Sequence, residues 1–308
     1  MLTYTPLVSV HMITYNHERY IANAIEGVLI QQTGFDFELI IADDCSTDNT
    51  HSIIQHYINN HPMGNCIKYF PQTKNLGVMP NFSFALRQCK GKYIAVCEGD
   101  DYWIDPYKLQ KQVAALEADL SVSMVITNRK VLNEGNLFVD ELYNIDCKKS
   151  NFCIADVVGG FVPGMQTILV RNYASLTDFL DAHPEFYYGD RYLAYFASLF
   201  GTILLLPDIT AVYRLTGNGA WSANAPIEKL HTYTKFMDDF HSSLGIPFNN
   251  DILAKFAFDS SYTTLRYCFK RPKQFLSSSY RKSIVNPWKK FNKMNRLKII
   301  ISVFFNRK

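Results

Sequence analysis

The sequence predicts an α/β fold: a mostly parallel sheet flanked by helices, followed by a helical, basic extension at the C-terminal end. Two observations predict the sheet, namely strand-length apolar runs that alternate with segments of helical periodicity, and acidic clusters that follow several of those runs. A third observation, the uneven distribution of charge, sets the extension apart. The 308 residues are 48% hydrophobic and 19% charged, a composition typical of a folded chain.

Strands and helices alternate along most of the chain. Residues 7–13 and 37–42 are near-continuous apolar runs, as expected for strands buried on both faces. A helix follows each run, and we expect Asn16 to cap the first and residues 46–48 to cap the second. We expect further strands at residues 67–70, 93–97, 122–127, 166–170 and 202–206, and helices at 80–88, from Pro106 onward and at 190–200. This alternation implies right-handed crossovers and a parallel sheet.

The alternation ends near residue 222, so we expect one domain over residues 1–222 and a helical region over 223–308. The charge divides in a similar place: residues 260–308 contain 13 basic residues and no acidic one, whereas the preceding residues carry a net charge of −10. Basic and apolar residues alternate around 288–300, a pattern that favours contact with an anionic membrane surface. The alternatives are that these residues only cover the acidic body, or that they bind nucleic acid, which no recognition motif supports.

The remaining composition indicates a cytoplasmic protein. Seven cysteines form no C-x-x-C pair, so neither a disulfide framework nor a zinc site is expected. The first residues lack the features of a signal peptide, and the apolar run at 299–305 is far shorter than the ~20 residues that span a bilayer.

Polar clusters follow three predicted strands, at residues 14–16, 43–44 and 98–101. Ligands of open parallel sheets bind beyond the carboxyl ends of the strands. Carboxylates gathered there repel one another unless a cation compensates them, and oxygen ligands suit Mg²⁺ or Mn²⁺. The alternative is that these aspartates only form turns. The chain has no G-x-G-x-x-G after its first strand, no P-loop motif and no G-x-S-x-G, which argues against dehydrogenases, P-loop phosphotransferases and serine hydrolases.

Several motifs follow one another along the chain: Thr14-Tyr15-Asn16, Glu38 to Asp48 with Asp43-Asp44, Asn75-Leu76-Gly77, Glu98-Gly99-Asp100-Asp101, Gly189-Asp190 and Val212-Tyr213-Arg214. In this order they resemble the inverting glycosyltransferases of family 2, of the type that acts in bacterial surface-polysaccharide synthesis. The resemblance covers residues 6–222 and implies the GT-A fold, a Rossmann-like arrangement. It also implies a hexosyltransferase that moves a sugar from a nucleotide-sugar donor, most often a UDP-sugar, to a hydroxyl of a glycan or lipid-linked acceptor.

The resemblance also implies a role for each motif. The nucleotide-sugar would be bound by Thr14, Tyr15, Asn16, Asp43, Asp44, Asn75, Asp100 and Arg214, and the metal, Mn²⁺ or Mg²⁺, by Glu98, Asp100 and Asp101. Asp190 would be the general base, and the acceptor would meet Trp103, Met165 and Gln166. The enzyme would then lie in the cytoplasm, at the inner face of the cell membrane.

The residues themselves leave alternatives open. Asp190 is also placed to cap a helix, Trp103 to pack in the core, and Arg214 to form a structural ion pair. Thr216 stands where many relatives have histidine, so the third metal ligand is open. A nucleotide-sugar-binding scaffold with a degenerate site, or a nucleotidyltransferase, is the alternative function.

Overall fold

The computed structural model describes residues 5–133, 136–140, 149–158, 161–182 and 188–216. The chain divides into two compact units, residues 1–157 with 162–219 and residues 158–161 with 220–308. The predicted helical region 223–308, its basic tail and the domain boundary at 222 lie outside the described residues. Within the described part, no helix has the length and apolar character needed to cross a membrane.

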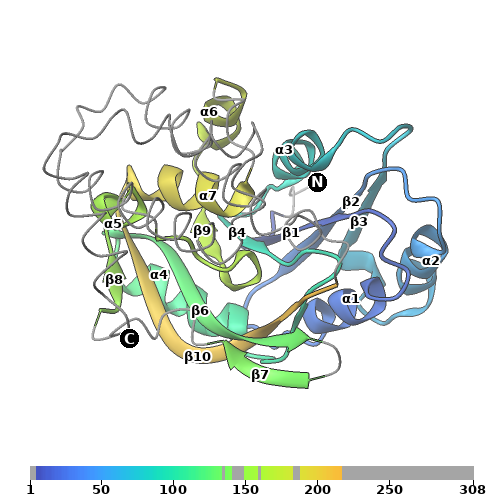
Figure 1. Ribbon diagram of the computed structural model, residues 1–308, viewed down its shortest axis with the longest axis horizontal. Coiled ribbons are helices and arrows are strands. Elements are labelled where there is room, and N and C mark those ends of the chain that lie inside the picture. Colours follow the sequence, from blue (N-terminus) through green and yellow to red (C-terminus); the bar gives the residue numbers. More distant parts are fainter. Residues whose placement is uncertain (1–4, 134–135, 141–148, 159–160, 183–187, 217–308) are drawn as a thin grey trace, which may run out of the picture. The chain divides into compact units, whose positions relative to one another are not determined.

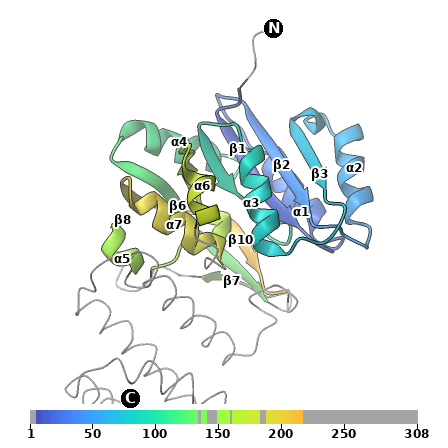
Figure 2. The ribbon, with the colours of Figure 1, turned by 90° about the horizontal axis from the view of Figure 1, so that it is seen from above.

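One sheet runs through the first unit, with the strand order β3-β2-β1-β4-β9-β6-β10-β5 (Figures 1 and 2). Its first four members are the parallel strands β1 (Val8–Thr14), β2 (Phe37–Asp43), β3 (Ile67–Pro71) and β4 (Tyr93–Val96). The next strands are β9 (Leu169–Arg171), antiparallel to both of its neighbours, β6 (Val122–Asn133), and β10 (Thr202–Arg214), parallel to β6. The predicted α/β fold with a largely parallel sheet is confirmed.

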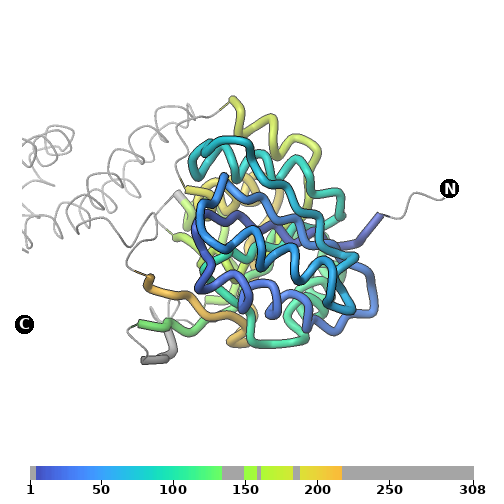
Figure 3. The backbone as a smooth tube through the Cα atoms, turned by 90° about the vertical axis from the view of Figure 1, so that its right-hand side faces the viewer, coloured from blue at the N-terminus to red at the C-terminus, as the bar shows by residue number. Residues whose placement is uncertain are grey.

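Short antiparallel strands complete the far half of the sheet. β5 (Tyr102–Trp103) and β8 (Asn151–Phe152) pair with β10, and β7 (Asn136–Asp140) pairs with β6. Register shifts interrupt the β6–β10 pairing between Leu205 and Ala211. Such irregularities bend strands, and the paired β6 and β10 are visibly curved (Figures 1 and 3).

Helices cover both faces of the sheet. α1 (Ile21–Leu29), α2 (Thr50–Asn60) and α4 (Lys108–Ala118) contribute to one hydrophobic layer, and α3 (Val78–Gln88), α6 (Leu176–Ala182) and α7 (Gly189–Ser198) lie on the opposite face (Figure 1). The short helix α5 (Ile154–Val158) and the 3₁₀ turns Gly64–Cys66 and Met165–Thr167 complete the described elements. Burial on both sides explains why the central strands read as continuous apolar runs.

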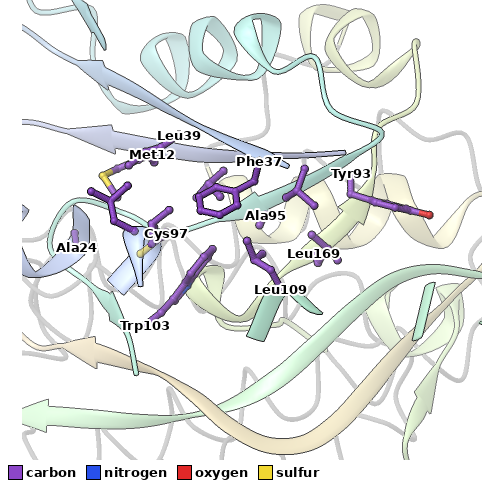
Figure 4. Packing of buried hydrophobic residues seen from close by; sticks show 14 of the residues in the cluster. Met12, Ala24, Phe37, Leu39, Tyr93, Ala95, Cys97, Trp103, Leu109 and Leu169 are labelled. Atoms are coloured by element: carbon purple, nitrogen blue, oxygen red, sulfur yellow. The ribbon is translucent and has the colours of Figure 1, made fainter. Parts of the chain in front are cut away.

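The core between the sheet and α1 and α4 is built from alternate strand residues (Figure 4). Met12, Leu39 and Ala95 point into this layer, where Trp103 and Leu109 meet them. Each fully buried large apolar side chain contributes about 1.5–3 kcal/mol to folding, so this layer holds the strand ends rigidly where the polar clusters begin.

Three local expectations were wrong. Asn16 does not cap a helix: its φ is 54°, its side-chain oxygen accepts a hydrogen bond from the Thr47 N–H, and α1 begins only at Ile21. The strand expected at 166–170 is a 3₁₀ turn followed by β9. β6 and β10 continue well past the apolar runs that predicted them, because their polar ends pair with each other.

Candidate active site

The loops that follow β1, β2 and β4 meet at one edge of the sheet. β1 lies between β2 and β4, so the direction of the chain crossover reverses here, which is where open α/β sheets bind ligands. The Asp44 N–H donates to the Thr14 carbonyl at 2.9 Å, and the Gly99 N–H donates to the Ile13 carbonyl at 3.0 Å. The structure therefore brings together the three polar clusters that the sequence singles out.

The two aspartates after β2 are held by the protein itself. Asp43 accepts hydrogen bonds from the Ser46 N–H at 2.9 Å and from the Tyr69 hydroxyl at 2.7 Å. Asp44 accepts from the Leu76 N–H at 2.6 Å and from the Gly77 N–H at 2.9 Å, one bond to each carboxylate oxygen. Both carboxylates are buried and serve first to shape the loops around them.

The other predicted nucleotide-binding residues line the same loops. Tyr15 is 44% exposed, so its side chain is accessible to a ligand. Asn16 joins the loop after β1 to the loop after β2 through the Thr47 N–H at 2.8 Å, and Asn75 donates to the Asp44 carbonyl at 3.2 Å. A Cβ at Gly99 would lie 2.7 Å from the Thr14 hydroxyl oxygen, so Thr14 packs directly on the acidic loop.

Glu98, Asp100 and Asp101 form the acidic cluster, in which ligand oxygens lie within 4.8 Å of one another. Asp101 is 1% exposed. Its Oδ1 accepts the Arg214 N–H at 2.9 Å, whereas its buried Oδ2 has no hydrogen-bond partner. Burial and the charge of Asp100 raise the pKa of Glu98 to about 8 and raise the pKa of Asp101 well above its usual range. Closely spaced carboxylates whose negative charges the protein does not fully compensate fit a hard divalent cation.

Asp190 lies in the first turn of α7, which begins at Gly189. The residue before the helix is Tyr188, whose side chain makes no cap hydrogen bond, so the N-cap interpretation of Asp190 does not hold. Burial raises the pKa of Asp190, and the charges of Arg191 and Arg129 oppose that rise. The charge of Asp190 in turn contributes to the raised pKa of Glu98, after burial and the charge of Asp100.

Arg214 ties the end of β10 to the acidic loop. Its guanidinium donates to the Asp100 carbonyl at 2.9 Å and to the Asn23 side chain at 3.0 Å, and it lies 4.2 Å from the centre of the Tyr102 ring. These contacts give Arg214 a structural role. Its partners are a backbone carbonyl and a side-chain amide, whereas the structural alternative in the sequence analysis was an ion pair with a carboxylate.

The three residues predicted to meet the acceptor substrate lie in different surroundings. Trp103 is 2% exposed and belongs to the core, and its indole N–H donates to the Gln166 carbonyl at 2.9 Å, so the core-packing alternative holds. Gln166 is 1% exposed, and its side-chain amide has no hydrogen-bond partner. Met165 packs beside the predicted base, since its Cε would lie 2.6 Å from a Cβ at Gly189.

Two charged residues that the structure singles out are assigned no role by the sequence analysis. Arg129, on β6, lowers the pKa of both Asp101 and Asp190 through its charge, against the larger effect of burial. Lys108 is buried, with its Nζ 4.5 Å above the Trp103 ring. The pairing of β6 with β10 brings Arg129 close to Tyr213. A single basic residue in a strand does not predict that pairing.

Comparison with known proteins agrees with this geometry. Residues 9–176 match the model of "Glycosyl transferase family 2". An uncharacterised protein of Mycobacterium bovis is 34% identical over 215 residues, which cover 70% of this chain and 60% of that protein. Escherichia coli chondroitin synthase is 38% identical over 133 residues, which cover 43% of this chain and 18% of the synthase. The chain thus spans less than two thirds of the length of these relatives.

Solved structures share the fold. Staphylococcus aureus TarS 1–349 in complex with UDP-GlcNAc aligns with a TM-score of 0.62 at 20% identity, covering 96% of this chain and 81% of that one. The mannosyltransferase PcManGT of Pyrobaculum calidifontis, in complex with GDP-Man and Mn²⁺, aligns with a TM-score of 0.56 at 16% identity, covering 99% and 89%. These likenesses confirm the expected GT-A arrangement. The family match extends over more than half of the residues, and the chain belongs to glycosyl transferase family 2.

Proposed function

We propose that this glycosyltransferase is metal-dependent and inverting, and that it moves a sugar from a UDP-sugar to a hydroxyl of a glycan or lipid-linked acceptor in cell-surface polysaccharide synthesis. The observation that carries the proposal is the buried Asp101 Oδ2, which has no partner within a cluster of three carboxylates next to Asp190. A buried acceptor of this kind is unfavourable until a ligand meets it.

Glu98, Asp100 and Asp101 are the residues that would hold the metal, Mn²⁺ or Mg²⁺. When bound, the ion supplies positive charge to the donor diphosphate and to the leaving group. The raised pKa values of Glu98 and Asp101 support this assignment, because burial and the neighbouring carboxylates disfavour the ionised cluster more than the Arg214 N–H and the charge of Arg129 favour it. Thr216 offers a hydroxyl in place of an imidazole, so these three carboxylates are the protein ligands we propose.

Asp190 would act as the general base. The acceptor oxygen attacks the anomeric carbon from the face opposite the leaving diphosphate, and its proton passes to the Asp190 carboxylate. A carboxylate whose pKa burial has raised is a stronger base than an exposed one and works closer to neutral pH. Gly189 gives Met165 access to the start of α7, so Met165 and the adjacent Gln166 are the residues we propose for the acceptor side.

The nucleotide would bind over the loops after β1 and β2. The exposed ring of Tyr15 offers a stacking surface for the base. Thr14, Asn16 and Asn75 shape the pocket, and the hydrogen bonds to Asp43 and Asp44 hold it in place before a ligand arrives. The TarS complex with UDP-GlcNAc supports a UDP-sugar, and the PcManGT complex makes GDP-sugars the alternative to test.

The acceptor and the location are proposed on the sequence alone. The basic residues around 288–300 would bring the enzyme to the anionic inner face of the membrane, where lipid-linked acceptors are assembled. Deletion of residues 284–308 should abolish binding to vesicles that contain anionic lipid, and unchanged binding would remove the membrane from the proposal.

The catalytic proposal is tested with a panel of UDP- and GDP-sugars in the presence of Mn²⁺, scored by release of the nucleotide. We expect Asp190→Asn to lower turnover by about 10²–10⁴-fold, the usual contribution of general-base catalysis, while the affinity for the nucleotide stays near that of the wild type. Transfer at the wild-type rate by Asp190→Asn would show that Asp190 is not the base.

A further inference from the structure

Arg129 packs against two neighbouring segments. Its Cζ lies 4.6 Å from the centre of the Tyr213 ring. It also lies against Gly164, where a Cβ would come within 2.8 Å of Nη1 and 3.3 Å of Cζ and Cδ of the arginine. The guanidinium therefore fits against bare backbone at Gly164, and packing restricts its position.

These two segments place Arg129 between the two halves of the active site. Tyr213 precedes Arg214, whose N–H donates to Asp101 in the acidic cluster. Gly164 precedes Met165, whose Cε touches Gly189 at the start of the helix that carries Asp190.

An arginine in this setting suits an oxyanion. A guanidinium offers a planar fork of N–H donors that matches two oxygens of a phosphate, and a restricted position reduces the entropy lost on binding. Arg129 contacts Tyr213, next to the residue that binds Asp101, and Gly164, next to the residue that packs on Gly189. In the proposed reaction, the bond between the sugar and the diphosphate breaks between the acidic cluster and Asp190.

We propose that Arg129 binds the diphosphate of the donor and stabilises it as the leaving group. This inference rests on the proposed function. In the transfer, the bond between the anomeric carbon and the phosphate oxygen breaks and its electron pair stays on that oxygen. The acceptor oxygen forms the new bond to the anomeric carbon, and its proton moves to Asp190. Arg129 donates hydrogen bonds to the phosphate oxygens on which the negative charge grows.

The test measures the affinity of the full chain for UDP and for uridine by calorimetry, with Mn²⁺ present. Arg129→Met removes the charge, and Arg129→Lys keeps the charge but loses the planar fork. We expect Arg129→Met to lower the affinity for UDP by about 10–100-fold, the usual loss for hydrogen bonds to a charged group. The affinity of Arg129→Lys for UDP should fall between those of Arg129→Met and the wild type. Uridine, which has no phosphate, should bind both variants as it binds the wild type.

The matched control is Arg171→Lys. Arg171 also lies over a tyrosine ring, at 5.7 Å from Tyr93, and donates to the Val122 carbonyl at 2.8 Å, on the neighbouring strand. Its replacement should leave the affinity for UDP unchanged. Thermal unfolding of each variant without nucleotide separates a binding defect from a folding defect.

The outcomes distinguish a failure of this inference from a failure of the proposed function. A folded Arg129→Met that binds UDP as the wild type does would overturn the inference, as would an equal loss for uridine and UDP, which indicates a distorted pocket. Comparison of UDP-glucose with UDP-glucuronate adds a further arm. A loss confined to UDP-glucuronate would assign Arg129 to a sugar carboxylate and overturn the phosphate assignment. A wild-type protein that binds no nucleoside diphosphate contradicts the proposed function itself.

Discussion

Two pairs of carboxylates lie at the same edge of the sheet, and the protein treats them in opposite ways. Asp43 and Asp44 receive hydrogen bonds from backbone and hydroxyl groups on every oxygen. Asp100 and Asp101 lie in the acidic cluster, where the Asp101 Oδ2 receives none. Sequence reasoning assigned ligand contacts to both pairs, because each consists of adjacent aspartates after a strand.

The difference separates carboxylates whose oxygens are satisfied within the protein from a buried carboxylate whose Oδ2 has no hydrogen-bond partner in the described part of the chain. A buried carboxylate with its acceptors satisfied stabilises the folded state, whereas a buried carboxylate beside like charges destabilises it until a cation binds. Asp44 holds Leu76 and Gly77, and so fixes the loop that precedes α3. The acidic cluster keeps a buried oxygen, Asp101 Oδ2, without a hydrogen-bond partner in the described part of the chain.

The largest expected effect is on activity. Asp101→Asn removes a proposed metal ligand but keeps an oxygen for the Arg214 N–H. We expect turnover with a nucleotide-sugar and Mn²⁺ to fall by about 10²–10³-fold, the usual loss when an electrostatic contact to the leaving group is removed. In chelator, the same variant should unfold at a temperature equal to or above that of the wild type, since a buried repulsive charge is gone. If Asp101→Asn is fully active and less stable than the wild type, Asp101 has a structural role like that of Asp44 and is not a metal ligand.

The same substitution at Asp44 should act in the opposite sense. In Asp44→Asn, one carboxylate oxygen becomes an amide NH₂ that faces the N–H of Leu76 or Gly77. We expect a loss of about 2–3 kcal/mol in the free energy of unfolding, the usual value for a broken hydrogen bond to a charged group. Urea unfolding measures it, with the exposed Asp36→Asn as control. Unchanged stability would mean that the two pairs of carboxylates do not differ as described.

How far the sequence predicts this structure depends on how local each feature is. The strands β1, β2 and β4 follow from apolar runs, and the polar clusters after them follow because parallel strands end at one edge. The partners of Asp44 and the position of Arg129 depend on loops and on the pairing of distant strands, which no short motif encodes. Trp103 and Asp101 lie two residues apart in one motif, yet one belongs to the core and the other to the site.

Lys108 is a buried basic residue that can be compared with the buried carboxylates. Lys108 lies over the Trp103 ring and donates to the Gln112 side chain at 2.5 Å, but no carboxylate meets it in the described part of the chain. Burial lowers the pKa of Lys108 to about 7. In the unfolded chain its pKa is about 10.4. Between these two values the unfolded state binds more protons than the folded state, so Lys108 makes the protein more stable as the pH rises, and its burial cost is complete below pH about 7.

The expected slope from Lys108 is about 1.4 kcal/mol per pH unit at most. Lys108→Met removes the titrating group, so the stability of the wild type relative to this variant should rise from pH ~7 to pH ~10. Urea unfolding at several pH values measures that difference. The thiols of Cys66 and Cys89, whose pKa values burial raises, lower the stability of both proteins with rising pH and cancel in the comparison. The exposed Lys74→Met should run parallel to the wild type. Parallel curves for Lys108→Met would show that Lys108 stays protonated in the folded state, and that the stacked Trp103 ring and the Gln112 oxygen compensate its charge as fully as backbone donors compensate Asp44.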